Sequence, residues 1–256
     1  MRFFSDLDNT LIYSHRHHIR EPKICVEVLH GKQQSYMSQK SYEYFQSQKW
    51  LNTTPVTTRT FDQYQRLNHV AKQFGWHSAL ICNGAILLIE GKEDIQWRKE
   101  SVLLAENDQA AFEDLYRRAY NLYGKHNIVL VDQIMFYVKG TGGQDVYETL
   151  TVHSDSSHIR VLRDSRKTYC IPISLSKGNA IKRFLDRTGE SFSVAAGDSS
   201  DFDISMADNA SIFLCPEEFQ KNPNGHSGLK KCKGLFADAI CDELDRIRAG
   251  VMINDR

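Results

Sequence analysis

The chain has 256 residues, in which 32 lysines and arginines balance 32 aspartates and glutamates, so its net charge favours neither nucleic acid nor an anionic membrane as a partner. No apolar stretch approaches the roughly 20 residues that cross a bilayer, and the N-terminal segment, whose apolar run is broken by acidic residues, is not a signal peptide. The six scattered cysteines are typical of reduced thiols, and we therefore expect a cytoplasmic protein.

Short apolar runs alternate with helical patterns along the chain, which is typical of a parallel sheet covered by helices. The first run, Arg2 to Ser5, ends in the acidic segment DLDNT. A strand, a tight turn at His30-Gly31-Lys32 and a second strand follow, and we expect this hairpin to shield the site or to contact substrate. The next patterns predict helices over 39–48 and 61–74, and strands that end at Val56 and Cys82.

The middle of the chain twice shows the order helix, strand, strand, without any sequence repetition. These elements are helices over 106–123 and 144–151, and strands over 127–133, 135–140, 158–164 and 167–173. Such a unit predicts a small α+β domain over 85–173, inserted into a main domain made of 1–84 and 174–256. The remaining patterns predict a helix over 177–187, a strand over 193–196, a loop over 221–228 and a helix over 235–252.

The two carboxylates of Asp6 and Asp8 directly follow the first predicted strand. The carboxyl ends of strands are where open α/β sheets bind ligands. Two carboxylates in one crevice repel each other unless a cation lies between them, and Mg²⁺ is the usual hard cation for carboxylate and phosphate oxygens. An ionised Asp6 can attack phosphorus, and Asp8 can give a proton to the leaving oxygen and later take one from water.

The segment FFSDLDNTL resembles the first motif of the haloacid dehalogenase (HAD) superfamily, and three later segments resemble the other motifs in the right order. By this resemblance, Thr57 would hold a phosphate oxygen with its hydroxyl. Lys177 would neutralise the charge that builds on the transferred phosphoryl group. Asp198 would bind Mg²⁺ together with Asp6 and Asp8, which makes Mg²⁺ the expected cofactor.

The second acid of the last motif can be Asp201 or Asp203. Many relatives carry an Asn-Asp pair three and four residues after the first aspartate, where this chain has Asp201 and Phe202. Because the superfamily tolerates a longer spacing, we favour Asp203 as the metal-binding acid and assign Asp201 to its surroundings.

The pair Asn83-Gly84, just before the insertion, resembles a segment of the Cof-like subgroup, also called subfamily IIB. The resemblance implies a Rossmann-like parallel-sheet HAD core with an inserted α+β type-two cap. Relatives in this subgroup include sucrose-phosphate and mannosyl-3-phosphoglycerate phosphatases, so a small phosphorylated metabolite, such as a sugar phosphate, is the expected partner. We predict that Arg59, Asn83 and Gly84 contact it, although a surface ion pair is an equal alternative for Arg59.

The sequence therefore predicts a magnesium-dependent phosphatase that forms an aspartyl-phosphate on Asp6. Two alternatives stay open: a phosphosugar mutase, which needs two anion sites, and a non-catalytic regulatory protein on the same scaffold. The presence of Asp6, Asp8 and Lys177 argues against the second. The oligomeric state is not predicted.

Two further groups of basic residues have no motif. In the cap, Lys139, Arg160 and Arg163 are expected to contact the leaving group and His158 is a further candidate, although for each residue taken singly a surface position is the favoured alternative. The histidines and arginines between His15 and Arg20 are expected to form a solvated loop rather than a transition-metal site, because no carboxylate or cysteine completes one.

Overall fold

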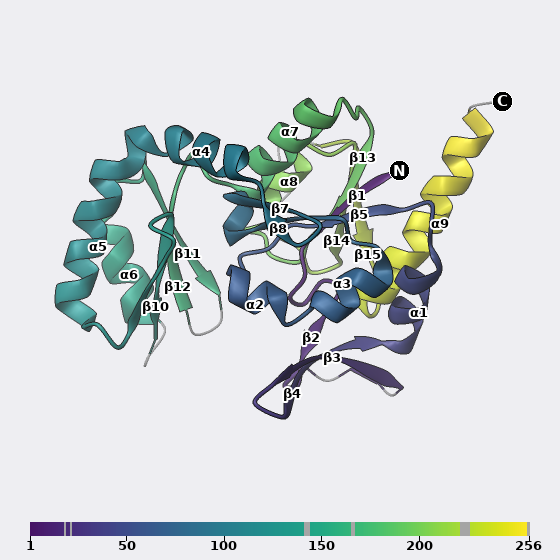
Figure 1. The fold of residues 1–256 in the computed structure, drawn as a ribbon, viewed down its shortest axis with the longest axis horizontal. Coiled ribbons are helices and arrows are strands. Elements are labelled where there is room, and N and C mark those ends of the chain that lie inside the picture. Colours follow the sequence, from purple (N-terminus) through teal and green to yellow (C-terminus); the bar gives the residue numbers. More distant parts are fainter. Residues whose placement is uncertain (18, 21, 141–143, 165–166, 221–225, 255–256) are drawn as a thin grey trace.

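The computed structural model describes residues 1–17, 19–20, 22–140, 144–164, 167–220 and 226–254 (Figure 1). Most of the predicted loop over 221–228 therefore lies outside the described residues. The central element is a five-stranded parallel sheet. Its strands, in spatial order, are β15 (Leu229–Cys232), β14 (Ile212–Pro216), β13 (Ser193–Ala196), β1 (Arg2–Ser5) and β5 (Asn52–Pro55).

Helices cover both faces of this sheet. Because neighbouring residues of a strand point to opposite faces, Phe3 and Phe4 of β1 enter two different hydrophobic clusters. The helices that contribute to the Phe3 cluster include α1 (Gln39–Ser47), α3 (Asn68–Phe74) and α9 (Phe236–Asn254), and those that contribute to the Phe4 cluster include α7 (Lys177–Thr188) and α8 (Ile204–Ala207). The predicted α/β class, a Rossmann-like parallel sheet, is confirmed.

A second, antiparallel sheet lies at the left of Figure 1. Its strands, in spatial order, are β11 (Ile159–Asp164), β12 (Lys167–Pro172), β10 (Met135–Lys139) and β9 (Ile128–Val131). The helices α5 (Gln109–Tyr123) and α6 (Gln144–His153) pack on one face of this sheet, which buries Phe112 and Leu150. We call this sheet and its two helices the cap, and they confirm the predicted α+β insertion.

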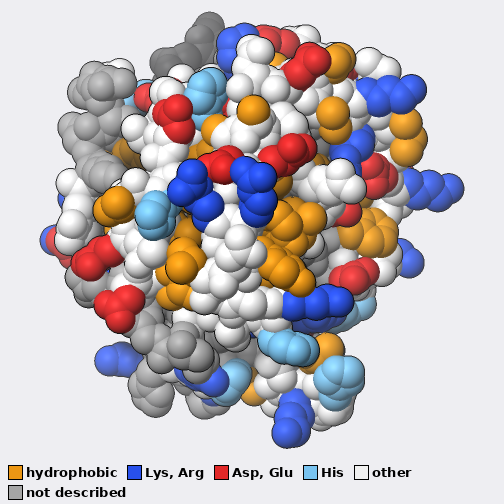
Figure 2. Space-filling view, turned by 90° about the vertical axis from the view of Figure 1, so that its left-hand side faces the viewer, with side chains coloured by type: hydrophobic (Ala, Val, Ile, Leu, Met, Phe, Trp, Pro, Cys, Tyr) orange, Lys and Arg blue, Asp and Glu red, His pale blue; other side chains and the backbone are white. Residues whose placement is uncertain are grey.

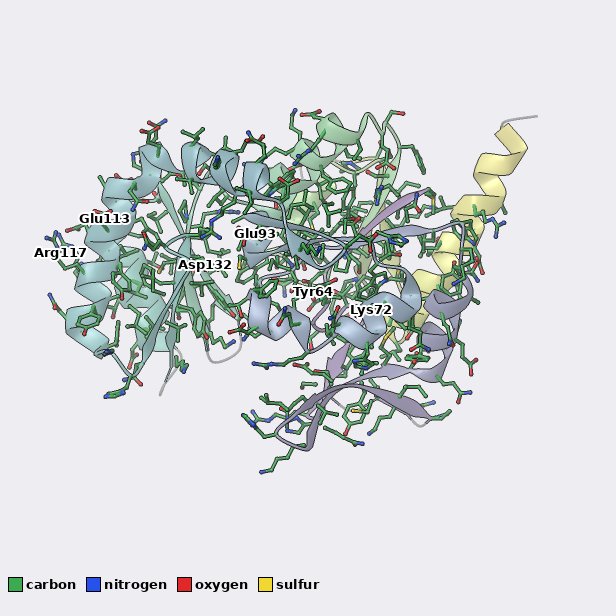
Figure 3. The ribbon with its side chains drawn as sticks, viewed as in Figure 1. Tyr64, Lys72, Glu93, Glu113, Arg117 and Asp132 are labelled. Carbon is green, nitrogen blue, oxygen red and sulfur yellow. The ribbon has the colours of Figure 1, made fainter. Side chains whose placement is uncertain are left out.

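The two faces of the cap differ in character. On the outer side of α5, Glu113 and Arg117 point away from the protein (Figure 3). A view of this side shows acidic and basic side chains interspersed around apolar ones (Figure 2). The inner face of the cap sheet carries Tyr137 and Tyr169, which belong to the hydrophobic cluster of Phe3. The inner face is therefore the one turned toward the core.

Two small antiparallel sheets complete the fold. One contains β2 (Tyr13–Ser14), β4 (Lys32–Ser38) and β3 (Lys23–Leu29), and the other contains β6 (Ser78–Ile81), β7 (Ile86–Ile89) and β8 (Lys92–Glu93). The predicted hairpin is confirmed, since β3 and β4 turn at His30 and Gly31 with φ values of 50° and 74°. A parallel bridge between Val56 and Leu80 links β6 to the edge of the central sheet.

The first residues of the segment predicted as cap pack on the core. Strand β7 pairs with β6, and Leu87 joins the Phe4 cluster together with Trp97 of the unpredicted helix α4 (Ile95–Leu104). The boundary between 84 and 85 stays a prediction. No helix in the described part of the chain has the length and apolar character that a membrane crossing requires.

The predicted helix over 61–74 was wrong in its continuity. The structure has two helices there, α2 (Phe61–Gln65) and α3, with Leu67 between them at φ −95° and ψ 6°. Leu67 is fully buried, and Arg66 reaches a carboxylate of the hairpin at 3.5 Å. The break lets Leu67 pack in the hydrophobic core while the preceding Arg66 reaches a carboxylate of the hairpin. The helix predicted over 106–123 begins at Gln109 instead, after the short 3₁₀ turn η2 (Glu106–Asp108).

Candidate active site

The loop after β1 folds back on itself and places Asp6 at the carboxyl edge of the sheet. The Asp6 amide donates to the carbonyl of Ala196 at 2.9 Å, which extends the strand pairing by one residue. The chain then reverses, because the Leu11 amide donates to the carbonyl of Leu7 at 3.0 Å. Asn9 adopts a φ of 61° in this turn, a conformation that asparagine tolerates better than most residues.

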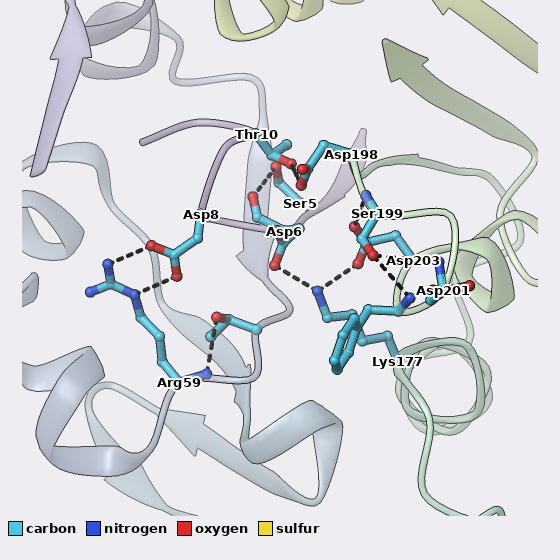
Figure 4. Close-up of polar contacts among 12 residues, drawn as sticks. Ser5, Asp6, Asp8, Thr10, Arg59, Lys177, Asp198, Ser199, Asp201 and Asp203 are labelled. Carbon is cyan, nitrogen blue, oxygen red and sulfur yellow. Dashed lines mark hydrogen bonds and ion pairs between the residues drawn. The ribbon is translucent and has the colours of Figure 1, made fainter. Parts of the chain in front are cut away.

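Lys177 lies in the first turn of α7 and bridges two aspartates (Figure 4). Its Nζ donates to Oδ1 of Asp6 and to Oδ1 of Asp203, each at 2.6 Å. The lysine side chain is only 2% exposed, and a buried charge is costly unless it is paired. Burial acts to lower the pKa of Lys177, but Asp203 and Asp6 outweigh it and hold that pKa above its usual value.

The loop after β13 supplies the other two acids. Asp198 Oδ1 accepts a hydrogen bond from the Thr10 hydroxyl at 3.1 Å, and Asp203 Oδ2 accepts one from the Ser199 amide at 2.9 Å. Gly197 has to be a glycine here, because a Cβ would lie 2.4 Å from Cβ and 2.6 Å from Oδ2 of Asp203. The loop can therefore fold over its own glycine and bury the Asp203 carboxylate completely.

Asp6, Asp198 and Asp203 each offer one carboxylate oxygen to a group whose atoms lie within 4.8 Å of one another. Burial raises the pKa of Asp6 well above its usual value, because Lys177 offsets it only in part and Asp203 adds to it. Burial, followed by the charge of Asp203, raises the pKa of Asp198 to about 7. Lys177 bonds two of these three carboxylates, Asp6 and Asp203, so the ionised group would carry an excess of negative charge that a further cation would balance.

Of the two candidates for the second acid, Asp203 belongs to this group and the exposed Asp201 does not. The Asp8 carboxylate, predicted to bind the metal as well, does not join it either. It pairs with Arg59, whose Nε and Nη2 each lie 2.8 Å from one Asp8 oxygen. Desolvation acts to raise the pKa of Asp8, but Arg59 outweighs it and holds that pKa below its usual value.

Thr57 is fully buried behind the cavity wall. Its hydroxyl accepts a hydrogen bond from the Arg59 amide at 3.2 Å, and its own amide donates to the carbonyl of Leu80 at 2.8 Å. The neighbouring Thr58, not Thr57, lines the cavity. The contact of Thr57 with phosphate stays a prediction.

Asn83 and Gly84 lie outside the cavity, at the connection between core and cap. The Asn83 side-chain amide donates to the carbonyl of Leu175 at 3.0 Å. A Cβ on Gly84, whose φ is 89°, would lie 2.3 Å from Cβ of Ala180. The structure thus gives these two residues contacts between segments of the chain, and their contact with substrate stays a prediction.

A cavity of about 600 Å³ extends from the carboxylate group to the cap. The cap contributes Arg163, Asp164, Lys167 and Tyr169, and the core contributes Glu27, Arg59, Arg66 and Phe202 besides the aspartates and Lys177. Of the three cap residues predicted to contact the leaving group, only Arg163 lines this cavity. Arg160 instead donates to the carbonyl of Leu175 at 2.8 Å.

Lys167 contacts two tyrosines of the cap sheet. Its Nζ lies 4.8 Å from the ring centre of Tyr137 and 3.4 Å from the hydroxyl of Tyr169. No motif marks Lys167, Asp164 or Glu27, and sequence reasoning missed all three. The burial of Glu27 beside the buried Val26 is visible only in the structure, because the sequence of β3 alternates without a break at Glu27.

The basic segment near His15 contributes no histidine to the group that can hold a metal, among the residues that the structure describes. The ring of His17 lies 4.7 Å from that of Tyr13, and His18 lies outside the described residues.

No family model matches the sequence, and no curated protein matches it significantly. Solved structures do match. The sucrose-phosphatase of Synechocystis sp. PCC6803, in complex with sucrose and phosphate, is 16% identical, with a TM-score of 0.64 over 96% of this chain and 97% of the other.

The sugar phosphatase BT4131 of HAD subclass IIB is 12% identical, with a TM-score of 0.61 over 96% of this chain and 98% of the other. This chain shares the fold of these structures. The trehalose-6-phosphate phosphatase of Aspergillus fumigatus is more distant, at 8% identity and a TM-score of 0.51 over 95% of this chain and 91% of the other. The predicted resemblance to the HAD superfamily is confirmed at the level of the fold.

Proposed function

We propose that the chain is a magnesium-dependent phosphatase that hydrolyses a phosphorylated sugar or a similar small metabolite through an aspartyl-phosphate on Asp6. The observation that carries this proposal is the buried Lys177, which bridges Asp6 and Asp203 at the carboxyl edge of the sheet. The fold supports it, because the similar solved structures include phosphatases of sucrose phosphate and trehalose 6-phosphate.

The carboxylates of Asp6, Asp198 and Asp203 fit a magnesium ion. They offer three hard oxygen ligands with excess negative charge, which is the donor set that Mg²⁺ prefers. Mg²⁺ bound there would neutralise negative charge on the phosphoryl oxygens.

The chain's own residues account for the covalent steps. An oxygen of Asp6 forms a bond to phosphorus while the bond from phosphorus to the leaving oxygen breaks. The leaving oxygen takes its proton from Asp8, which must therefore carry one when substrate is bound, although Arg59 lowers its pKa and favours the ionised form in the free site. Water then attacks phosphorus, the bond to Asp6 breaks, and Asp8 takes the proton of the water. Lys177 holds Asp6 in place through its 2.6 Å hydrogen bond and balances its charge.

A screen of phosphorylated metabolites with Mg²⁺, scored both by free phosphate and by isomer formation, tests the function. We expect release of phosphate from at least one sugar phosphate. Isomer formation without phosphate release would favour the mutase, and no turnover of any substrate would contradict the proposal.

Removal of the metal is expected to stop turnover reversibly. Dialysis against EDTA should abolish phosphate release, because the excess negative charge of Asp6, Asp198 and Asp203 would repel the substrate phosphate. Added Mg²⁺ should restore the rate, as measured by a titration of activity against free Mg²⁺. Full activity in the presence of the chelator would rule out the metal role of these carboxylates.

Charge reversal on the inner face of the cap is expected to change substrate choice. Lys167→Glu should reduce kcat/KM for a bulky sugar phosphate by roughly 10- to 100-fold, the effect of one lost charged contact. Turnover of a small aryl phosphate, which barely reaches the cap, should change much less. Lys139→Glu is the matched control, because Lys139 is an exposed cap lysine that does not line the cavity. Equal losses on both esters would show that Lys167 does not recognise the leaving group.

A further inference from the structure

Glu27 of the hairpin is placed in the cavity by an irregularity in β3. The pairing of β3 with β4 shifts register on both sides of Glu27, whose partner is Ser35. Val26 and Glu27 are consecutive and both are buried, although consecutive residues of a regular strand point to opposite faces. A bulge of this kind re-aims a side chain. Here the bulge directs the Glu27 carboxylate from the hairpin toward Arg59 of the core.

The Glu27 carboxylate is buried among donors. Oε2 accepts hydrogen bonds from the Ser35 hydroxyl at 2.7 Å and from Nη2 of Arg59 at 3.0 Å, while Oε1 lies 3.5 Å from Nη1 of Arg66. Glu27 is only 4% exposed, and burying a carboxylate costs free energy that such partners must offset. Two arginines from the core segment 59–66 therefore converge on one residue of the hairpin.

Arg59 connects Glu27 to the proton donor of the proposed reaction. Its Nη2 lies between the two carboxylates, at 2.8 Å from Asp8 Oδ1 and 3.0 Å from Glu27 Oε2. A guanidinium binds a carboxylate through a rigid, planar fork, so the side chain that fixes Arg59 also fixes where Asp8 lies. The side chain of Asp8 is half exposed and, within the described residues, its hydrogen bonds come from Arg59 alone, whereas the Arg59 side chain is only 9% exposed.

We propose that Glu27 is a positioning residue for Asp8, acting through Arg59. This inference rests on the proposed function, because it concerns the step in which Asp8 gives its proton to the leaving oxygen. In that step the bond from phosphorus to the leaving oxygen breaks, the bond to Asp6 forms, and the proton moves from Asp8 to the leaving group. Glu27 touches neither reacting atom and sets the place from which the proton departs.

The dependence of the rate on the leaving group tests this role. Glu27→Gln keeps the shape of the side chain and removes its charge. The rate at which it forms the phospho-enzyme from an alkyl or sugar phosphate, whose leaving oxygen needs a proton, should fall by about 10- to 100-fold in a single turnover, as for a misplaced catalytic group. The same rate with p-nitrophenyl phosphate, whose leaving group departs without a proton, should fall less than about threefold. Asp8→Asn should show the same selectivity in this step with a larger loss, about 10²- to 10⁴-fold.

Two further variants separate positioning from folding. Ser35→Ala removes one hydrogen bond to Glu27 and keeps every charge, so it should show a weaker version of the same selectivity even if Glu27→Gln folds poorly. Glu43→Gln is the matched control, because it makes the same chemical change at an exposed residue of α1, and it should leave both rates unchanged.

Equal losses on the two esters would overturn the inference and indicate a structural role for Glu27. A rise in KM for the sugar phosphate with unchanged kcat would also overturn it, since Glu27 would then bind the substrate directly. Absence of turnover by the unchanged protein on both esters would overturn the proposed function, and this inference with it.

Discussion

Asp6→Asn is expected to lower kcat by at least about 10⁴-fold, the scale seen when a catalytic nucleophile is removed. The asparagine oxygen can still accept the 2.6 Å hydrogen bond from Lys177, so the fold should be retained. The amide cannot attack phosphorus, and no aspartyl-phosphate can form. Phosphate release under saturating substrate measures the loss, and trapping of labelled phospho-enzyme measures the missing intermediate.

Asp208→Asn is the control for this change, because it makes the same substitution at an exposed aspartate at the end of α8. It should leave kcat unchanged. Turnover by Asp6→Asn above the trace that deamidation produces would contradict the assignment of the nucleophile. Thermal unfolding of both variants, measured in parallel, shows whether a loss of activity is a loss of fold.

Lys177→Met is expected to remove activity and about 3–5 kcal/mol from the free energy of unfolding, the usual cost of leaving buried charges without their partner. Methionine fills a similar volume, so the loss comes from the carboxylates of Asp6 and Asp203, which lose their shared cation. Denaturant unfolding at neutral pH measures it. Lys182→Met, an exposed lysine of the same helix whose side chain is 63% exposed, should change stability by less than about 0.5 kcal/mol.

The pH dependence of the stability of Lys177→Met shows whether unpaired charge or poor packing causes that loss. In the folded variant the pKa of Asp6, already raised by burial and no longer lowered by Lys177, lies above its value in the unfolded chain. The folded state then binds more protons than the unfolded state, so the variant should regain stability as pH falls toward the ordinary carboxyl range. A loss of stability that stays constant with pH would indicate a packing defect instead.

The parts of the site that follow a strand directly could be predicted from the sequence. Asp6 and Asp198 come immediately after short apolar runs, and Lys177 opens a helix with a serine cap, so local patterns mark their places. The fold could be predicted for the same reason, because apolar runs and helical spacing are local signals. Strand β15 was missed since its sequence LKKC has two exposed lysines and no alternating apolar pattern, a composition typical of an edge strand.

The rest of the cavity depends on contacts between distant segments. Glu27 reaches it from a hairpin through a register shift, and Lys167 reaches it from the cap. The break between α2 and α3 has the same origin, because the partner of Arg66 is Glu27 on the hairpin. Helical periodicity over 61–74 contains no information about that partner, and tertiary contacts override local preference at such points.

The carbonyl oxygen of Leu175 lies where the core and the cap meet. It accepts hydrogen bonds from Asn83, on the outgoing connection to the cap, and from Arg160 of the cap sheet, at 3.0 and 2.8 Å. Leu175 itself lies on the returning connection, just before α7. Both connections between the core and the cap are thus held to each other through one oxygen atom, two residues before Lys177.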